Sequence, residues 1–137
     1  MNKDEKESII ADTNNKPNGT GLTRVLKATR CSMLGFKAAY KHESAFRQEL
    51  WLCCLLLPLS FLIATSGVQL GLLIASLLLI LLVEIINSAI EAIVDRIGIE
   101  LHELSGRAKD LGSTAVFLAL CICVVIWAGV IFDNYFT

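Results

Sequence analysis

Long apolar blocks without charge alternate with short polar segments along this chain. One charge-free block covers residues 51–83 and another covers residues 111–132. At ~1.5 Å per helical residue the first block is too long for one perpendicular crossing of a bilayer, and Thr65-Ser-Gly67 near its middle is a turn signal. The pattern predicts three transmembrane helices, at about residues 49–64, 68–94 and 111–132.

The segment before the first apolar block has a different pattern. From Leu22 to Tyr40 apolar residues recur every three or four positions, and Lys27, Arg30 and Lys37 gather on an adjoining face. This predicts an amphipathic helix at about residues 22–41 that lies in the membrane interface. Residues 1–20 are polar, mixed in charge and without an apolar core, which predicts a disordered tail and no signal peptide. Residues 21–137 would form a single membrane domain.

Composition supports an all-α integral membrane protein. Of the 137 residues 55% are hydrophobic, which is too apolar for an ordinary soluble domain. The five cysteines are odd in number and have no Cys-x-x-Cys spacing, so neither disulfides nor a zinc site is expected. Lys and Arg precede the first block or lie between the second and third helices, so that side should be cytoplasmic.

A polar stripe occupies the end of the second predicted transmembrane helix. At ~100° per residue, five side chains fall within an arc of about 100°: Glu84, Asn87, Ser88, Glu91 and Asp95. Ionisable groups at membrane depth are costly, and those that occur usually serve ion, proton or substrate chemistry. The alternative is a solvated helix end, or polar groups that join helices by hydrogen bonds.

The sequence contains no P-loop and no Gly-x-Gly-x-x-Gly turn after a strand, so a nucleotide site would have to be of another kind. Glu43 and Glu91 could hold Mg²⁺ through carboxylate oxygens, with water and phosphate completing the coordination. Lys109 could neutralise a phosphate, and Glu84 could take a proton from a substrate hydroxyl.

Each of these residues also has a plainer interpretation. Glu43 stands four residues before Arg47 and could form a helical ion pair with it. Lys109 could be a solvated charge beside Asp110. His102 has no second histidine or cysteine near it in the sequence, so it is more typical of a polar loop residue than of a metal ligand.

Four sequence blocks together resemble the small prokaryotic integral-membrane diacylglycerol kinase family. They are Gly21-Leu-Thr-Arg24, Glu43-Ser-Ala-Phe-Arg-Gln-Glu49, Glu84-Ile-Ile-Asn-Ser-Ala-Ile-Glu91-Ala-Ile-Val-Asp-Arg-Ile-Gly98 and His102-Glu-Leu-Ser-Gly-Arg-Ala-Lys-Asp110. The resemblance covers most of the chain and follows the family's order. It departs in a longer amino-terminal tail and at Met33, where the family often has Trp.

The resemblance implies an enzyme, a homotrimeric membrane kinase domain in the bacterial inner membrane with its active site facing the cytoplasm. It would transfer the γ-phosphoryl group of ATP to diacylglycerol, forming phosphatidic acid for phospholipid recycling, with membrane lipids and no nucleic acid as partners. By the same resemblance Glu84 is the general base, Glu43 and Glu91 bind Mg²⁺, and Arg24 and Glu84 contact the substrate. The implied nucleotide-binding positions are Ser32, Asn87, Glu100, His102, Lys109 and Asp110.

Two rival functions are open at this point. The same machinery in an undecaprenol kinase would phosphorylate a prenyl alcohol, and nothing in the sequence gives a physical criterion for acyl against prenyl chains. A small proton-coupled transporter would also use a glutamate in the membrane. Glu84 lies too near the end of its helix for a midplane site, and no inverted repeat is detectable, which disfavours the transporter.

Overall fold

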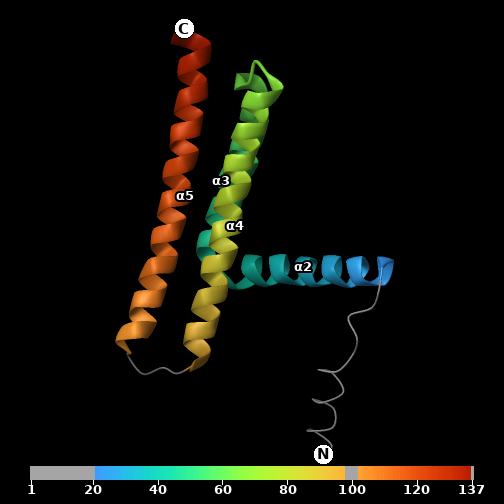
Figure 1. Cartoon of the computed structure of the whole chain (residues 1–137), viewed down its shortest axis with the longest axis vertical. Helices are drawn as coiled ribbons and strands as arrows, with labels where there is room; N and C mark the ends of the chain where they lie inside the picture. Colours follow the sequence, from blue (N-terminus) through green and yellow to red (C-terminus); the bar gives the residue numbers. More distant parts are fainter. Residues whose placement is uncertain (1–20, 98–101, 137) are drawn as a thin grey trace, which may run out of the picture. The chain divides into compact units, whose positions relative to one another are not determined.

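The computed structural model describes residues 21–97 and 102–136, and these are almost wholly helical (Figure 1). The helices are α2 (Leu22–His42), α3 (Ser44–Ile63), α4 (Gly67–Ile97) and α5 (Glu103–Phe136). The described residues contain no strand, and α3, α4 and α5 are each long and apolar enough to cross a membrane. The predicted all-α membrane fold is therefore confirmed. The tail predicted for residues 1–20 lies outside the described residues.

The helices extend further than hydropathy predicted. Helix α3 begins at Ser44 rather than near residue 49, α4 continues to Ile97, and α5 begins at Glu103 rather than near residue 111. The spans predicted from hydropathy therefore lie largely within longer helices. Hydropathy marks where contact with lipid ends, whereas helical hydrogen bonding continues through Glu, Arg, Lys and Ala, which favour helix. Helix thus carries the polar stripe and Lys109 beyond the apolar segments.

The chain divides into two compact units, Met1–Lys37 and Ala38–Thr137. Within the first unit, α2 exposes apolar side chains along its length, among them Leu22, Leu26 and Met33. Basic residues alternate with them along the same helix. A helix with an exposed apolar face and basic side chains is suited to the surface of an anionic membrane, in agreement with the predicted amphipathic segment.

In the second unit α3, α4 and α5 lie side by side, and α4 packs along both of the others (Figure 1). The buried core of this bundle consists of Cys53, Leu73, Leu77, Ile80, Ala119, Cys123, Trp127 and Val130. Large apolar side chains such as Trp51, Leu62 and Phe117 remain exposed on its outside. An apolar exterior around a small core fits helices that face lipid or other subunits.

Besides the polar stripe, two sets of hydrogen bonds between polar side chains link the helices of the bundle. In the core the Trp127 indole N–H donates to Ser76 Oγ at 3.2 Å. The Ser76 hydroxyl in turn donates to the Leu73 carbonyl oxygen at 2.7 Å. At the end where α3 gives way to α4, Gln69 and Asn134 exchange amide hydrogen bonds at 2.8 and 3.1 Å. These bonds fix the position of α5 along α4. The polar residues of the two helices at the opposite end of the bundle are therefore held in a defined register.

Candidate functional site

Four carboxylates from α3 and α4 converge at the end of the bundle opposite the Gln69–Asn134 pair. Glu84 is only 3% exposed, and Glu49 on α3 is 9% exposed. The Glu84 carboxylate lies within electrostatic range of Glu91, Glu43 and Glu49. Within the described parts of the chain none of the four forms an ion pair with a basic side chain. Several carboxylates close together attract a cation.

Glu43 is the N-cap residue of α3, and its position follows from the junction of two helices. Its backbone is extended, with φ −103° and ψ 117°, and its carboxylate makes no capping hydrogen bond. Its backbone N–H donates to the Ala39 carbonyl at 2.9 Å, which completes the last turn of α2. Arg47 donates instead to the carbonyls of Tyr40 and Lys41, at 3.0 and 3.4 Å. The alternative of a Glu43–Arg47 ion pair is therefore wrong, and the Glu43 carboxylate is available to a ligand.

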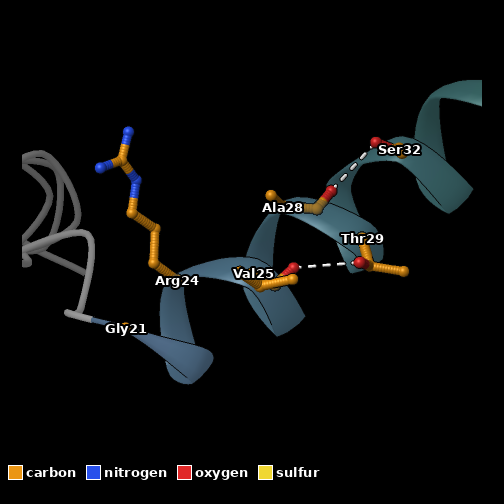
Figure 2. Close-up of a pocket in the computed structure, with 6 residues that line it drawn as sticks. All are labelled: Gly21, Arg24, Val25, Ala28, Thr29 and Ser32. Atoms are coloured by element: carbon orange, nitrogen blue, oxygen red, sulfur yellow. Dashed lines mark hydrogen bonds between the residues drawn. The ribbon is translucent and has the colours of Figure 1, made fainter.

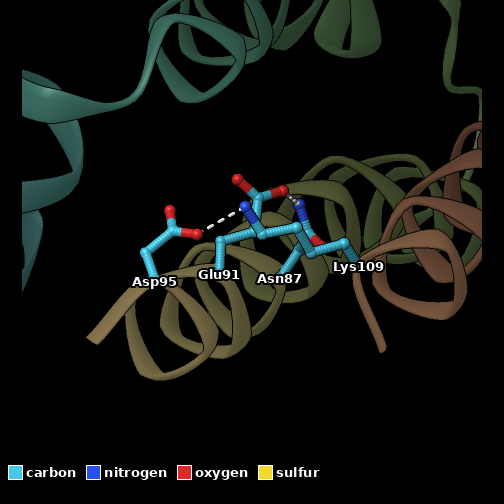
Figure 3. A network of polar contacts seen from close by, with 4 residues as sticks. All are labelled: Asn87, Glu91, Asp95 and Lys109. Atoms are coloured by element: carbon cyan, nitrogen blue, oxygen red, sulfur yellow. Dashed lines mark hydrogen bonds and ion pairs between the residues drawn. The ribbon is translucent and has the colours of Figure 1, made fainter. Parts of the chain in front are cut away.

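Asn87 and Glu91 lie one turn apart on α4 and are joined directly. The Asn87 Nδ2 donates to Glu91 Oε1 at 2.9 Å (Figure 3). Asn87 is buried and Glu91 half-buried, so the bond begins inside the bundle and ends at its rim. The residues of the predicted stripe all lie on α4, and their burial decreases from Glu84 to Asp95.

Lys109 on α5 reaches across to α4 and forms an ion pair with Asp95 at 2.6 Å (Figure 3). Its ammonium group also lies within electrostatic range of Glu91. Lys109 is thus partly solvated, and its ion-pair partner is Asp95 on the neighbouring helix. Because the two side chains are 39% and 64% exposed, the pair contributes little to stability, but it holds a cation next to the carboxylate cluster.

His102 and Asp110 lie at the start of α5. The Leu104 backbone N–H donates to His102 Nδ1 at 3.2 Å, so the imidazole caps the helix, a use that the interpretation as a polar loop residue did not specify. Asp110 is exposed one residue after Lys109, and its side chain is open to solvent. Glu100, also predicted for the nucleotide site, lies outside the described residues.

Arg24 and Ser32 lie on the part of α2 that belongs to the first unit. They border a shallow hollow on α2 together with Gly21, Val25, Ala28 and Thr29 (Figure 2). The Arg24 guanidinium extends away from the helix, whereas the Ser32 hydroxyl donates to the Ala28 carbonyl at 3.1 Å. Both side chains are exposed and on the same stretch of helix, so both are accessible to a polar ligand.

The donor set at the carboxylate cluster fits Mg²⁺ bound together with a phosphate ligand. Among the described residues no group of three or more His, Cys, Asp or Glu side chains is arranged to hold a metal alone. Mg²⁺ in proteins commonly takes one or two carboxylates and completes its octahedron with water and phosphate oxygens. Glu43 and Glu91, both within electrostatic range of Glu84, could supply such a pair, and Glu49 Oε2 is a buried oxygen without a hydrogen-bond partner within the described residues.

Glu49 is the residue of this cluster to which sequence reasoning gave no role. It shares the buried face of α3 with Phe46 and Cys53, at spacings of three and four residues. A carboxylate in phase with the apolar positions of a helix is a signal that it faces the protein interior. Its nearness to Glu84 depends on how α3 packs against α4, which the sequence pattern does not contain.

Comparison with known proteins gives consistent matches over most of the chain. Residues 30–131 match the family model described as prokaryotic diacylglycerol kinase. The chain is 50% identical to a diacylglycerol kinase of Haemophilus influenzae over 113 residues, which cover 82% of this chain and 96% of the relative. It is 46% identical to that of Escherichia coli K12 over 118 residues, covering 86% and 97%. A Pseudomonas aeruginosa relative is 50% identical over 112 residues, covering 82% and 91%.

Proposed function

This chain belongs to the prokaryotic diacylglycerol kinase family, and from that premise we propose that it transfers the γ-phosphoryl group of ATP to the free hydroxyl of diacylglycerol. The products would be phosphatidic acid and ADP. The observation that carries the proposal is the cluster of Glu43, Glu49, Glu84 and Glu91 at one end of three apolar helices. At that level of a membrane a lipid hydroxyl and a water-soluble nucleotide can meet.

Glu84 is proposed as the general base that accepts the proton of the lipid hydroxyl. Within the described chain its carboxylate makes no hydrogen bond, so both oxygens are free to accept one from a substrate. Its 3% exposure excludes most water from the position of the nucleophile. Phosphoryl transfer needs an oriented nucleophile more than covalent help from the protein, and one fixed acceptor provides that orientation.

Glu43 and Glu91 are proposed as the ligands of Mg²⁺. When bound, this ion offsets the negative charge that ATP brings to the carboxylate cluster. The chain's contribution is to fix both carboxylates from separate helices, Glu43 by the helix junction and Glu91 by the bond from Asn87. Asn87 is thus proposed to position Glu91 and to lie beside the nucleotide.

Lys109 is proposed to hold the phosphates of the nucleotide. Lys109 already places a positive charge beside Glu91, and an arriving phosphate would compete with Asp95 for it. The other proposed nucleotide contacts are Ser32, Glu100, His102 and Asp110, and Arg24 would contact the lipid or its phosphate. His102 can cap α5 and still present Nε2, because the capping bond uses only Nδ1.

A homotrimer with shared sites is proposed as the active assembly. A single chain has a small core, and its described residues hold no group of three or more metal-ligating side chains. One chain alone is therefore too small to enclose both ATP and a lipid. The α4 helix also keeps an exposed apolar stripe with small residues one turn apart, a pattern that lets membrane helices approach closely: Gly71, Ala75, Leu78, Leu82, Ile86, Ala89 and Ile93. The excess of Lys and Arg near the carboxylate end supports a cytoplasmic site in the inner membrane.

The proposal is tested with purified protein in mixed micelles that contain either diacylglycerol or undecaprenol, ATP and Mg²⁺. We expect ADP release and labelled phosphatidic acid with diacylglycerol, and loss of both when Mg²⁺ is chelated. Faster turnover of undecaprenol than of diacylglycerol would assign the chain to the other lipid substrate. No phosphorylation of either lipid by folded protein would overturn the proposed function.

A further inference from the structure

Gly112 marks the closest approach of the α5 backbone to a side chain of α4. A Cβ built at Gly112 would collide with Asn87 Oδ1 and would lie 3.2 Å from Asn87 Cγ and 3.8 Å from its Cβ. A Cβ built at any other described glycine, including Gly129 on the same helix, would meet nothing within 4 Å. Glycine is among the least favourable residues inside a helix, so its presence at this buried contact calls for a reason.

The space at Gly112 decides which way the Asn87 amide points. Asn87 Oδ1 faces the Gly112 backbone, where it is buried and has no hydrogen-bond partner within the described chain. The other end of the amide, Nδ2, therefore points along α4 and donates to Glu91 Oε1 at 2.9 Å. The bond to Glu91 favours this orientation of the amide, and the space at Gly112 is what permits it.

We infer that Gly112 is a positioning residue of the metal site, since its missing side chain lets Asn87 hold the Glu91 carboxylate. The inference rests on the proposed function in that it takes Glu91 as a Mg²⁺ ligand. The hydrogen bond from Asn87 engages one oxygen of Glu91, and the other oxygen would be the one to bind the cation. Groups that orient a metal ligand in this way are worth about 10- to 100-fold in metal affinity.

The Gly112→Ala variant is expected to fold, and its effect is expected to be confined to the orientation of the Asn87 side chain. The obstructing atoms are at the far end of the rotatable Asn87 side chain, so the amide would turn away before the helices part. The Asn87 Cβ, at 3.8 Å from the new methyl group, would remain in ordinary van der Waals contact. Alanine also favours helix more than glycine does, so α5 itself is not weakened.

The experiment compares Gly112→Ala with the matched control Gly129→Ala in purified full-length protein. Mn²⁺ binding is measured by titration without ATP or lipid, and the side-chain amide of Asn87 is followed by NMR with ¹⁵N-labelled asparagine. We expect Gly112→Ala to shift the Asn87 amide resonance and to weaken Mn²⁺ binding by about 10-fold or more. Gly129→Ala should leave both unchanged.

A double variant separates positioning from a general packing defect. Asn87→Ala alone should weaken Mn²⁺ binding to a similar degree, and adding Gly112→Ala to it should cost nothing further, because the colliding amide is gone. An unshifted amide resonance in Gly112→Ala, unchanged Mn²⁺ affinity, or an equal second loss in the double variant would overturn the inference. If the wild-type protein bound no Mn²⁺, the proposed metal ligands would fail, and the amide resonance alone would decide the role of Gly112.

Discussion

Replacing Glu84 by Gln is expected to inactivate the protein and to stabilise it. Gln has the size of Glu but does not take a proton from a hydroxyl, and removal of a general base typically costs about 10²- to 10⁴-fold in rate, equivalent to roughly 3 to 5 kcal/mol of barrier. Glu84 is 3% exposed, makes no hydrogen bond within the described chain, and lies within range of three other carboxylates. Neutralising it removes a poorly compensated buried charge, which should raise the free energy of unfolding by about 1 kcal/mol.

Two measurements on the same preparation test this prediction. ADP release with saturating diacylglycerol and ATP in mixed micelles gives the turnover, and detergent-induced or thermal unfolding gives the stability. Size-exclusion elution checks that the assembly is unchanged. Near-normal turnover in a folded Glu84→Gln variant would refute the assignment of the base. Loss of activity together with clear destabilisation would refute the reasoning about the charge, because the carboxylate would then have a stabilising partner.

Three further predictions follow from the same geometry. If sites are shared between subunits, with Arg24 and the carboxylate cluster supplied by different chains, mixed trimers of Arg24→Ala and Glu91→Gln should recover part of the wild-type rate after subunit exchange; a fully active monomer in nanodiscs would contradict this. Lys109→Met should raise the Michaelis constant for ATP about 10-fold or more, whereas Asp95→Asn, which frees the lysine, should lower it or leave it unchanged; steady-state kinetics with varied ATP would show the split. Ser76→Ala should lower the free energy of unfolding by about 1 to 3 kcal/mol with unaltered turnover, because it leaves a buried indole N–H unpaired, and an unchanged melting temperature would argue against that hydrogen bond.

The parts that depend on order along the chain could be predicted from the sequence. Runs of apolar residues identified three spanning helices, and helical phase alone put Glu84, Asn87 and Glu91 on one face. Both patterns are local, because hydropathy and the period of the helix need only neighbouring residues. The full helices are longer than the apolar runs, since Glu and Lys favour helix and continue it beyond the apolar segment.

The parts that depend on which helices touch could not be predicted. Glu49 is a single carboxylate in an apolar helix until α3 packs against α4 and brings it near Glu84. Gly112 is an unremarkable glycine in sequence, and its contact with Asn87 exists only in the packing of α5 on α4. Local rules also favoured an ion pair of Glu43 with Arg47, but the arginine is used by the carbonyls at the end of α2 instead.

Phosphoryl transfer is proposed to take place at the carboxylate cluster between α3 and α4. The most direct test is the anomalous scattering of Mn²⁺ in crystals of the assembled protein with a non-hydrolysable ATP analogue and diacylglycerol. We expect a peak in contact with the carboxylates of Glu43 and Glu91, with the lipid hydroxyl at hydrogen-bond distance, about 3 Å, from Glu84. A metal and nucleotide bound elsewhere, with Glu84 facing no substrate oxygen, would contradict it.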